Sequence, residues 1–451
     1  MPIDTNTSLN ARLIRWGGAA LVFSGIAACT QPQSVEPTIE DEARISVGEA
    51  PIPVERSDNG AQVPRDIASA DEEALYLDRF DRMIEAFSNG GSITSIYDTL
   101  DHVPGAATPA LLGRRQEGTG LTHSARLAAI EYAQARRSAA LMVIRNGEVI
   151  LEEYFSGNSS ESLINGKSLA KPLGVLAIGR AIETGHIESL DQPASDFLTE
   201  WRGSPKEAIT IRHLLGMRSG LAPQASGPTA DHIMNRAYLH PRHGEIIINE
   251  YPLVNEPGAR YEYANANAEL IAPIIKRATG QDYASWVSAE LIDKLDAAGG
   301  DIWVNRSGGI AHSGCCILLP AETFAKLGLL VLQDGVWQGE TLLPDGYTEA
   351  MRSSTPGNIH AGLGVYLGHP YKEFRGANNP ESDPFATYHS APYARDDLYL
   401  FDGNSNQVIY MIPSEDLVIL RVGDTPSRDM PWDNAILPNL ILEGLSDEKS
   451  P

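Results

Sequence analysis

Two groups of short apolar runs, far apart in the chain, constrain the fold most strongly. Residues 139–144 and 149–155 flank an Asn146-Gly147 pair, and Asn-Gly between two apolar runs is the strongest short signal for a β-hairpin. A late group of three runs predicts three more strands, at residues 397–401, 407–412 and 417–422. Helical patterns fill much of the chain between the groups. We therefore expect an α+β fold: one antiparallel sheet closed by both ends of the chain, flanked by helices, with a helical subdomain inserted at about residues 180–300.

The length and charge of the chain limit its organisation and its partners. Its 451 residues suffice for a catalytic body, which we place at residues 67–445. Residues 70–87 open that body with helical spacing. One apolar face is expected, formed by Leu75, Leu77, Phe80, Met83, Ile84 and Phe87. The formal net charge of −24 argues against binding nucleic acid, because phosphates would be repelled.

The N-terminus predicts export. Arg12 and Arg15 precede an apolar run that ends in Ala28-Cys29, a run too short to span a bilayer. The ending resembles the lipobox of bacterial lipoproteins, which implies a signal peptide at residues 1–28 and a lipid on Cys29. A plain secretory signal is the alternative. Residues 29–66 are rich in Pro, Glu, Asp and Ser and predict a disordered acidic tether. We expect an exported lipoprotein, in the periplasm or at the cell surface, that meets the membrane through its lipid anchor only.

Ser168 and Lys171 are the first candidate catalytic pair. A spacing of three on a helix places both side chains on one face, within reach of each other. A serine hydroxyl becomes a strong nucleophile only when a neighbour takes its proton, and a lysine can do so when it is neutral. Ser-x-x-Lys alone is a weak signal, because it arises often by chance.

Tyr263-Ala264-Asn265 is the second element. A tyrosine near the lysine could carry a proton to the leaving group, and the Asn265 amide could bind a substrate or hold the lysine. An ordinary buried tyrosine that opens a helix would give the same local pattern.

Four stretches in a fixed order make the signal specific: Ser168-Leu169-Ala170-Lys171, residues 209–221, residues 257–265, and Cys315-Cys316 followed by residues 324–330. On these residues the chain resembles the serine β-lactamase-like hydrolases of the class C type. That group includes class C β-lactamases, D-alanyl-D-alanine carboxypeptidases, esterases and 6-aminohexanoate-dimer hydrolase. The resemblance implies the β-lactamase/transpeptidase-like fold and no metal, with Ser168 as the acylated serine, Lys171 as its activating partner and Tyr263 as the family tyrosine.

The third family element is a Lys-Thr-Gly or His-x-Gly triplet beside the site, and its best match is Phe401-Asp402-Gly403. The cationic first residue is absent. Gly403 is retained, which is consistent with close approach of a substrate to the backbone. By the match, backbone N–H groups of Ser168 and Asn404 would form the oxyanion hole.

Cysteine and histidine patterns add little. Adjacent Cys315 and Cys316 lie about 3.8 Å apart at Cα, whereas ordinary disulfides need roughly 4.4–6.8 Å. We therefore expect two small buried residues, with a vicinal disulfide or a reactive thiol as the alternatives. His240, His243 and Glu245 could suggest a metal site, but Pro241 breaks the helical spacing and no further cluster follows. We expect no metal and no cofactor.

The sequence thus predicts a serine hydrolase that acts through an acyl-enzyme on an ester or amide bond of a small molecule. An esterase or a hydrolase of short amides is favoured over a β-lactamase or D-alanyl-D-alanine peptidase, because the third element has no cation. An apolar Phe401 in its place is expected to contact a hydrocarbon group of the substrate. A non-catalytic peptidoglycan-binding module is the alternative outside enzymes. The sequence leaves the physiological substrate and the oligomeric state open.

Overall fold

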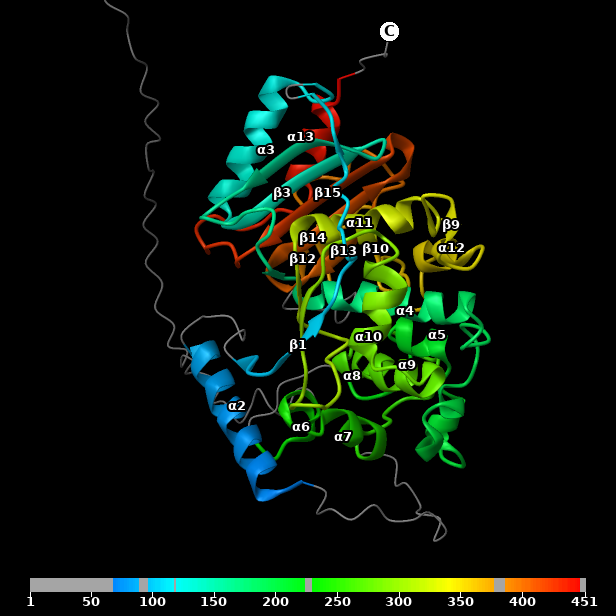
Figure 1. Cartoon of the computed structure of the whole chain (residues 1–451). Coiled ribbons are helices and arrows are strands. Elements are labelled where there is room, and N and C mark those ends of the chain that lie inside the picture. Colours follow the sequence, from blue (N-terminus) through cyan, green and yellow to red (C-terminus); the bar gives the residue numbers. More distant parts are fainter. Residues whose placement is uncertain (1–67, 89–95, 117–118, 224–228, 377–385, 447–451) are drawn as a thin grey trace, which may run out of the picture. The chain divides into compact units, whose positions relative to one another are not determined.

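The structure is a computed structural model that describes residues 68–88, 96–116, 119–223, 229–376 and 386–446 (Figure 1). The predicted signal peptide, Cys29 and the whole of the predicted tether lie outside these residues. Within them, no helix combines the length and the apolar character that crossing a membrane requires.

The central sheet joins strands from both ends of the catalytic body. Its order is β10-β13-β14-β15-β3-β4-β2. The late strand β15 pairs antiparallel with the early strand β3, with Ile419 opposite Val143. Only the short edge strand β2 runs parallel to its neighbour. The predicted sheet is therefore confirmed, with strands β2 (Gly113–Arg114), β3 (Ser138–Arg145), β4 (Glu148–Tyr154), β10 (Tyr366–Leu367), β13 (Tyr399–Gly403), β14 (Gln407–Ile412) and β15 (Leu417–Gly423).

The turn between β3 and β4 follows from its two residues. Asn146 and Gly147 have φ values of 53° and 76°, in the left-handed region that a two-residue hairpin turn of the primed type requires. Glycine adopts this region without strain, and asparagine tolerates it better than most residues. The Asn-Gly pair thus sets the register of the hairpin.

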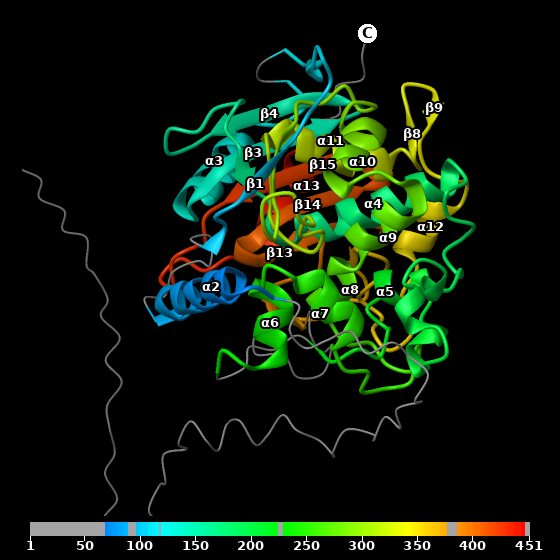
Figure 2. The same cartoon turned by 60° about the horizontal axis from the view of Figure 1, so that its bottom comes forward.

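Both faces of the sheet are buried. Helices α3 (His123–Ala135) and α13 (Ile436–Gly444) cover one face, while α11 (Ala321–Leu332) covers the other (Figures 1 and 2). Helix α4 (Ala170–Glu183) belongs to the same buried core as α11. Neighbouring strand residues alternate between the two cores, as Met142 and Val143 do. The continuous apolar runs in the sequence reflect this double burial.

A helical region follows α4, and its described residues up to Gly299 contain no strand. Its helices and turns are η3 (Ala194–Asp196), η4 (Thr199–Trp201), η5 (Pro205–Ala208), α5 (Ile211–Leu215), α6 (Ile233–Leu239), α7 (His243–Asn249), α8 (Asn265–Glu269), α9 (Ile271–Thr279), α10 (Tyr283–Val287) and η6 (Ser288–Ile292). A second sheet, ordered β1-β6-β7-β5, consists of β1 (Leu100–Val103), β5 (Ile164–Asn165), β6 (Gly300–Trp303) and β7 (Ile317–Leu319). Its strand β5 leads directly to Ser168.

The remaining elements are α2 (Ala70–Ser88), η2 (Lys167–Leu169), β8 (Val336–Trp337), β9 (Glu340–Thr341), α12 (Tyr347–Arg352), β11 (Phe374–Arg375), β12 (Thr387–Tyr388), η7 (Asn404–Asn406) and η8 (Pro413–Glu415). In α2 the prediction of the buried face is correct only in part. Met83 is buried as predicted, whereas Leu77 and Ile84 are exposed and Tyr76 and Arg79 are buried in their place. The reason is Arg79, whose guanidinium donates to the Leu239 and Asn305 carbonyls and fixes the rotation of the helix.

The adjacent cysteines are not two free thiols. Cys315 and Cys316 are joined as a vicinal disulfide. Both are buried, and the hydroxyl of Tyr97 lies 3.2 Å from the Cys315 sulfur. The preference for two unlinked residues, drawn from ordinary disulfide spacing, is therefore corrected.

Candidate active site

Ser168 sits in a tight turn between a strand and a helix. Strand β5 ends at Asn165, Gly166 follows, and Ser168 is the middle residue of η2. A Cβ on Gly166 would lie 2.5 Å from the ring of Phe324, so only glycine fits there. The sequence predicted a helix that begins at Ser168; α4 begins at Ala170 instead, because η2 forms the first turn.

Lys171 lies directly beside the serine. Its Nζ is 3.0 Å from Ser168 Oγ and donates to the Gly314 carbonyl over 2.7 Å. The side chain comes from the first turn of α4, where Pro172 is also tolerated. An amine at this distance can take the hydroxyl proton whenever the amine is neutral.

Tyr263 completes the group. Its Oη lies 3.4 Å from Ser168 Oγ, and Lys171 Nζ lies 5.0 Å from the centre of its ring. Tyr263 immediately precedes Ala264, the N-cap of α8. The structure therefore brings together Ser168, Lys171 and Tyr263, which are far apart in the sequence.

A cavity opens at this group, with about 560 Å³ of empty space that includes open solvent. Most of its wall is apolar, and the residues that contribute hydrocarbon include Val175, Leu214, Leu215, Met217, Ile271 and Val365. Tyr261 also lines it, and burial raises the pKa of that phenol above its usual value. Such a wall suits a substrate with an uncharged hydrocarbon group near the scissile bond.

In the third family element, Phe401-Asp402-Gly403, the side chain that lines the cavity is not the one that we predicted. Phe401 is 1% exposed and packs in the core, whereas Asp402 lines the cavity. Adjacent strand residues face opposite sides, so the cavity wall receives the carboxylate and not the aromatic ring. Hydrocarbon contact between Phe401 and a substrate is therefore excluded.

Asp402 does not stand alone. It pairs with Arg375, whose guanidinium also lies 4.2 Å from the ring centre of Tyr366. Burial raises the pKa of Asp402, and the arginine opposes that shift. Arg395 has another partner, Glu415, at 2.7 Å. The Arg375 charge beside the third element is thus engaged by Asp402.

Of the residues predicted to bind the oxyanion or the substrate, only Gly403 is shown close to the serine turn. A Cβ on Gly403 would lie 3.1 Å from the Gly166 carbonyl, which explains the glycine beside the serine turn. Asn404 follows as an exposed residue at the start of η7. Asn265 is the first residue of α8. Neither asparagine is among the residues that line the cavity.

A sequence profile of the family described as Beta-lactamase matches residues 122–433, and this range contains all of the site residues described above. The chain belongs to the beta-lactamase family. The predicted resemblance is thereby confirmed.

Known relatives agree with this membership. The 6-aminohexanoate-dimer hydrolase of Paenarthrobacter ureafaciens is 26% identical over 223 residues, which cover 47% of this chain and 56% of that enzyme. The chain thus spans about half the length of this curated relative. Among solved structures, a Bacillus anthracis protein assigned as a 6-aminohexanoate-dimer hydrolase has a TM-score of 0.59 at 18% identity, over 81% of this chain and 94% of its own. The hydrolase EstCE1 has a TM-score of 0.51 at 16% identity, over 71% and 96%. At these identities the two structures show a shared fold.

Two features of the site were not predicted from the sequence. Gly314 supplies the acceptor for Lys171, and a backbone carbonyl leaves no signal in a sequence. A buried cluster of His243, Glu269 and His312 also lies in the same region of the fold, with potential ligand atoms within 4.8 Å of one another. The sequence pattern around His243 did not indicate this cluster.

The other two residues of that predicted group have separate partners. His240 Nε2 lies 3.2 Å from Glu73, and burial lowers the pKa of His240 to about 4. Glu245 pairs with Arg242 at 3.5 Å.

Proposed function

We propose that the protein is a serine hydrolase that cleaves an ester or amide bond through an acyl-enzyme. The observation that carries this proposal is the placement of Ser168 Oγ 3.0 Å from Lys171 Nζ at the mouth of an apolar cavity. Membership of the beta-lactamase family supports it.

The chemistry assigns a role to each group. Ser168 Oγ attacks the carbonyl carbon while Lys171 accepts its proton. Tyr263 passes a proton to the departing alcohol or amine as the bond to the acyl carbon breaks. Water then attacks the acyl-enzyme, gives up a proton to the same pair and releases the acid. Backbone N–H groups of Ser168 and Asn404 are the proposed donors to the oxyanion, while Gly403 permits close approach of the backbone and Asn265 supports substrate binding.

The cavity favours neutral esters and short linear amides as substrates. Its wall is largely hydrocarbon, and among the described residues that line it Lys171 is the only cation. A β-lactam carboxylate would meet Asp402, while Arg375 is 3% exposed and held by that acid. The names of the relatives, an amide-dimer hydrolase and a hydrolase with acyltransferase activity, fit this class.

We expect the purified protein to hydrolyse p-nitrophenyl butyrate with a higher kcat/KM than nitrocefin. A missing charge-assisted hydrogen bond to the β-lactam carboxylate costs about 2 kcal/mol, which corresponds to roughly thirtyfold in rate. Parallel assays on the two substrates, with a linear amide as a third, measure the ratio. Nitrocefin turnover equal to or above that of the ester would favour a β-lactamase instead.

Fluorophosphonate labelling separates an enzyme from a binding module. A serine hydrolase should carry one covalent adduct at Ser168, because the probe reacts with an activated serine hydroxyl. A protein that binds peptidoglycan fragments but remains unlabelled would refute the proposed activity and support the non-catalytic alternative.

We propose further that the protein is a lipoprotein whose mature N-terminus is Cys29. The support is the apolar run before Ala28-Cys29 and the acidic stretch after it. A single acyl chain holds proteins to membranes only marginally, so stable anchoring needs more than one.

Mass spectrometry of the protein from membranes of its native bacterium should find a lipid-modified peptide that begins at Cys29. Cys29→Ser should release the protein from the membrane fraction, because the serine cannot form the thioether. An unmodified N-terminus, at Met1 or downstream of Cys29, would exclude the anchor.

A further inference from the structure

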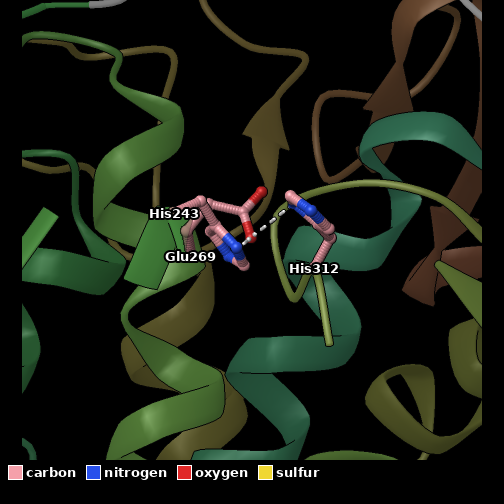
Figure 3. A group of neighbouring side chains, drawn as sticks. All are labelled: His243, Glu269 and His312. Atoms are coloured by element: carbon pink, nitrogen blue, oxygen red, sulfur yellow. Dashed lines mark ion pairs between the residues drawn. The ribbon is translucent and has the colours of Figure 1, made fainter. Parts of the chain in front are cut away.

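A cluster of buried ionisable groups joins two segments of the active site. Its members are His243, Glu269 and His312, whose side chains are fully buried and point toward one another (Figure 3). Glu269 Oε2 lies 3.5 Å from His243 Nε2 and 3.4 Å from His312 Nδ1. In the described part of the chain, the polar atoms of the cluster make no hydrogen bond of normal geometry. Glu269 therefore has these two rings as its ion-pair partners.

Two histidines and a carboxylate are a common donor set for transition metals. Here, however, the rings of His243 and His312 are stacked, with centres 3.9 Å apart and planes 12° apart. His312 also stacks on Trp303, with centres 3.6 Å apart. A histidine binds an ion near the plane of its ring, and two stacked, nearly parallel rings cannot both meet that condition for one ion. The arrangement suits a carboxylate that forms an ion pair with each ring.

The cluster is not expected to contribute much to the stability of the folded protein. A buried carboxylate costs free energy unless it is paired, and well-packed apolar residues often replace buried ionic groups without loss. Burial by itself would raise the pKa of Glu269, but His312 and His243 hold that pKa well below its usual range. A charge kept at this cost suggests a role besides packing.

The connections of the cluster indicate that role. Glu269 ends α8, the helix that follows Tyr263, and its neighbour Ala268 lines the cavity. On the other side, His312 leads into Ser313, whose hydroxyl donates to the Ala268 carbonyl over 2.6 Å. The next residue, Gly314, provides the carbonyl that accepts from Lys171. The cluster thus links the segment that carries Tyr263 to the segment that holds the lysine.

Gly314 also packs directly against the carboxylate. A Cβ on Gly314 would lie 2.8 Å from Glu269 Oε1, so the backbone of residue 314 has little room to shift toward α8. Any displacement of His312 would therefore move the Gly314 carbonyl away from its position beside Lys171.

We propose that Glu269 is a positioning residue that, through His312, fixes the Gly314 carbonyl and so holds the Lys171 amine against Ser168. The inference rests on the proposed function, because it assumes that Lys171 activates Ser168. Glu269 does not line the cavity and does not touch the reacting atoms.

Two substitutions test the role. Glu269→Leu replaces the carboxylate by an apolar group of similar size, whereas Glu269→Gln keeps one carbonyl oxygen as an acceptor. We expect Glu269→Leu to lower kcat and the rate of fluorophosphonate labelling by up to about 10²-fold, the scale of a misplaced catalytic group, with KM changed by less than about threefold. Glu269→Gln should restore both rates to within about threefold of wild type, because Gln can still accept from the rings.

Val418→Ala is the matched control for stability. Val418 is fully buried on β15, far in sequence from the cluster, and its truncation leaves a cavity in the core. This control should lower Tm while kcat per labelled molecule stays at the wild-type value. The opposite pattern is expected of Glu269→Leu, with Tm retained and kcat per labelled molecule lowered. If Glu269→Leu instead lowers Tm and keeps the wild-type kcat per labelled molecule, the proposal is overturned.

Crystal structures provide a readout that needs no activity. In Glu269→Leu, the Gly314 carbonyl should leave hydrogen-bonding distance of Lys171 Nζ; an unchanged distance of 2.7 Å would refute the positioning role. Stoichiometric zinc in the wild-type protein, lost in Glu269→Gln, would refute it as well by showing a metal site. A wild-type protein that hydrolyses nothing and resists labelling at Ser168 would refute the proposed function, while the two crystal structures would still decide the role of Glu269.

Discussion

Ser168→Ala should reduce hydrolysis to background, the largest effect expected of any single substitution in this protein. Removing the nucleophile of a serine hydrolase costs a factor on the order of 10⁶ in kcat. The substitution deletes one hydroxyl from a tight turn, and the neighbouring Lys171 keeps its bond to the Gly314 carbonyl. Folding should therefore be retained, which circular dichroism and Tm can verify. The measurement is kcat for p-nitrophenyl butyrate, together with the loss of fluorophosphonate labelling.

Ser195→Ala is the matched control. Ser195 is 3% exposed, and its hydroxyl donates to the Glu207 carbonyl over 3.4 Å in the helical region. This variant loses the same atom from a buried site and should keep wild-type turnover and labelling. More than a few per cent of wild-type activity in Ser168→Ala would remove Ser168 from the mechanism.

Lys171→Met and Tyr263→Phe should each lower kcat by about 10²–10⁴-fold, the usual range for general acid–base groups. Methionine keeps most of the volume of the buried lysine and removes its amine, so Ser168 loses the proton acceptor at 3.0 Å. Phenylalanine removes only the hydroxyl 3.4 Å from the serine. Steady-state kinetics and labelling rates on folded protein measure both losses.

Lys206→Met is a close control for the lysine. Lys206 also donates to a backbone carbonyl, that of Ile248, and its Nζ lies 5.5 Å from the ring centre of Trp201. Its environment thus resembles that of Lys171 without a serine beside it. We expect near wild-type kcat for this control. Wild-type rates in Lys171→Met or Tyr263→Phe would exclude that residue from proton transfer.

The sheet was predictable because its signals are local. The Asn146-Gly147 turn fixes the hairpin, and the five apolar runs correspond to strands β3, β4, β13, β14 and β15. The face of α2 was predictable from apolar spacing only in part, since Met83 is buried but Leu77 and Ile84 are not. Arg79 occupies the buried side and finds its acceptors on residues far away in the sequence, which a helical periodicity does not contain.

Those site residues were predictable that are linked by helical spacing or that match a family motif. Ser168 and Lys171 are neighbours by helical geometry, and the family match supplied Tyr263. The order of side chains at the third element was misjudged, because an assignment of Phe401 to the cavity ignored the alternation of the strand. His243, Glu269 and His312 meet only after three separate segments pack together, so no spacing rule could have found them.

The pairing of the first long strand with the last also determines when the molecule can become active. On the ribosome, Ser168, Lys171, Tyr263 and Gly314 all emerge before β13, which carries the Asp402 wall of the cavity, and before β15, which closes on β3. Closing so long a loop costs chain entropy that no local contact repays. The nascent chain therefore carries its reactive residues without a finished pocket around them until β13 and β15 have been synthesised.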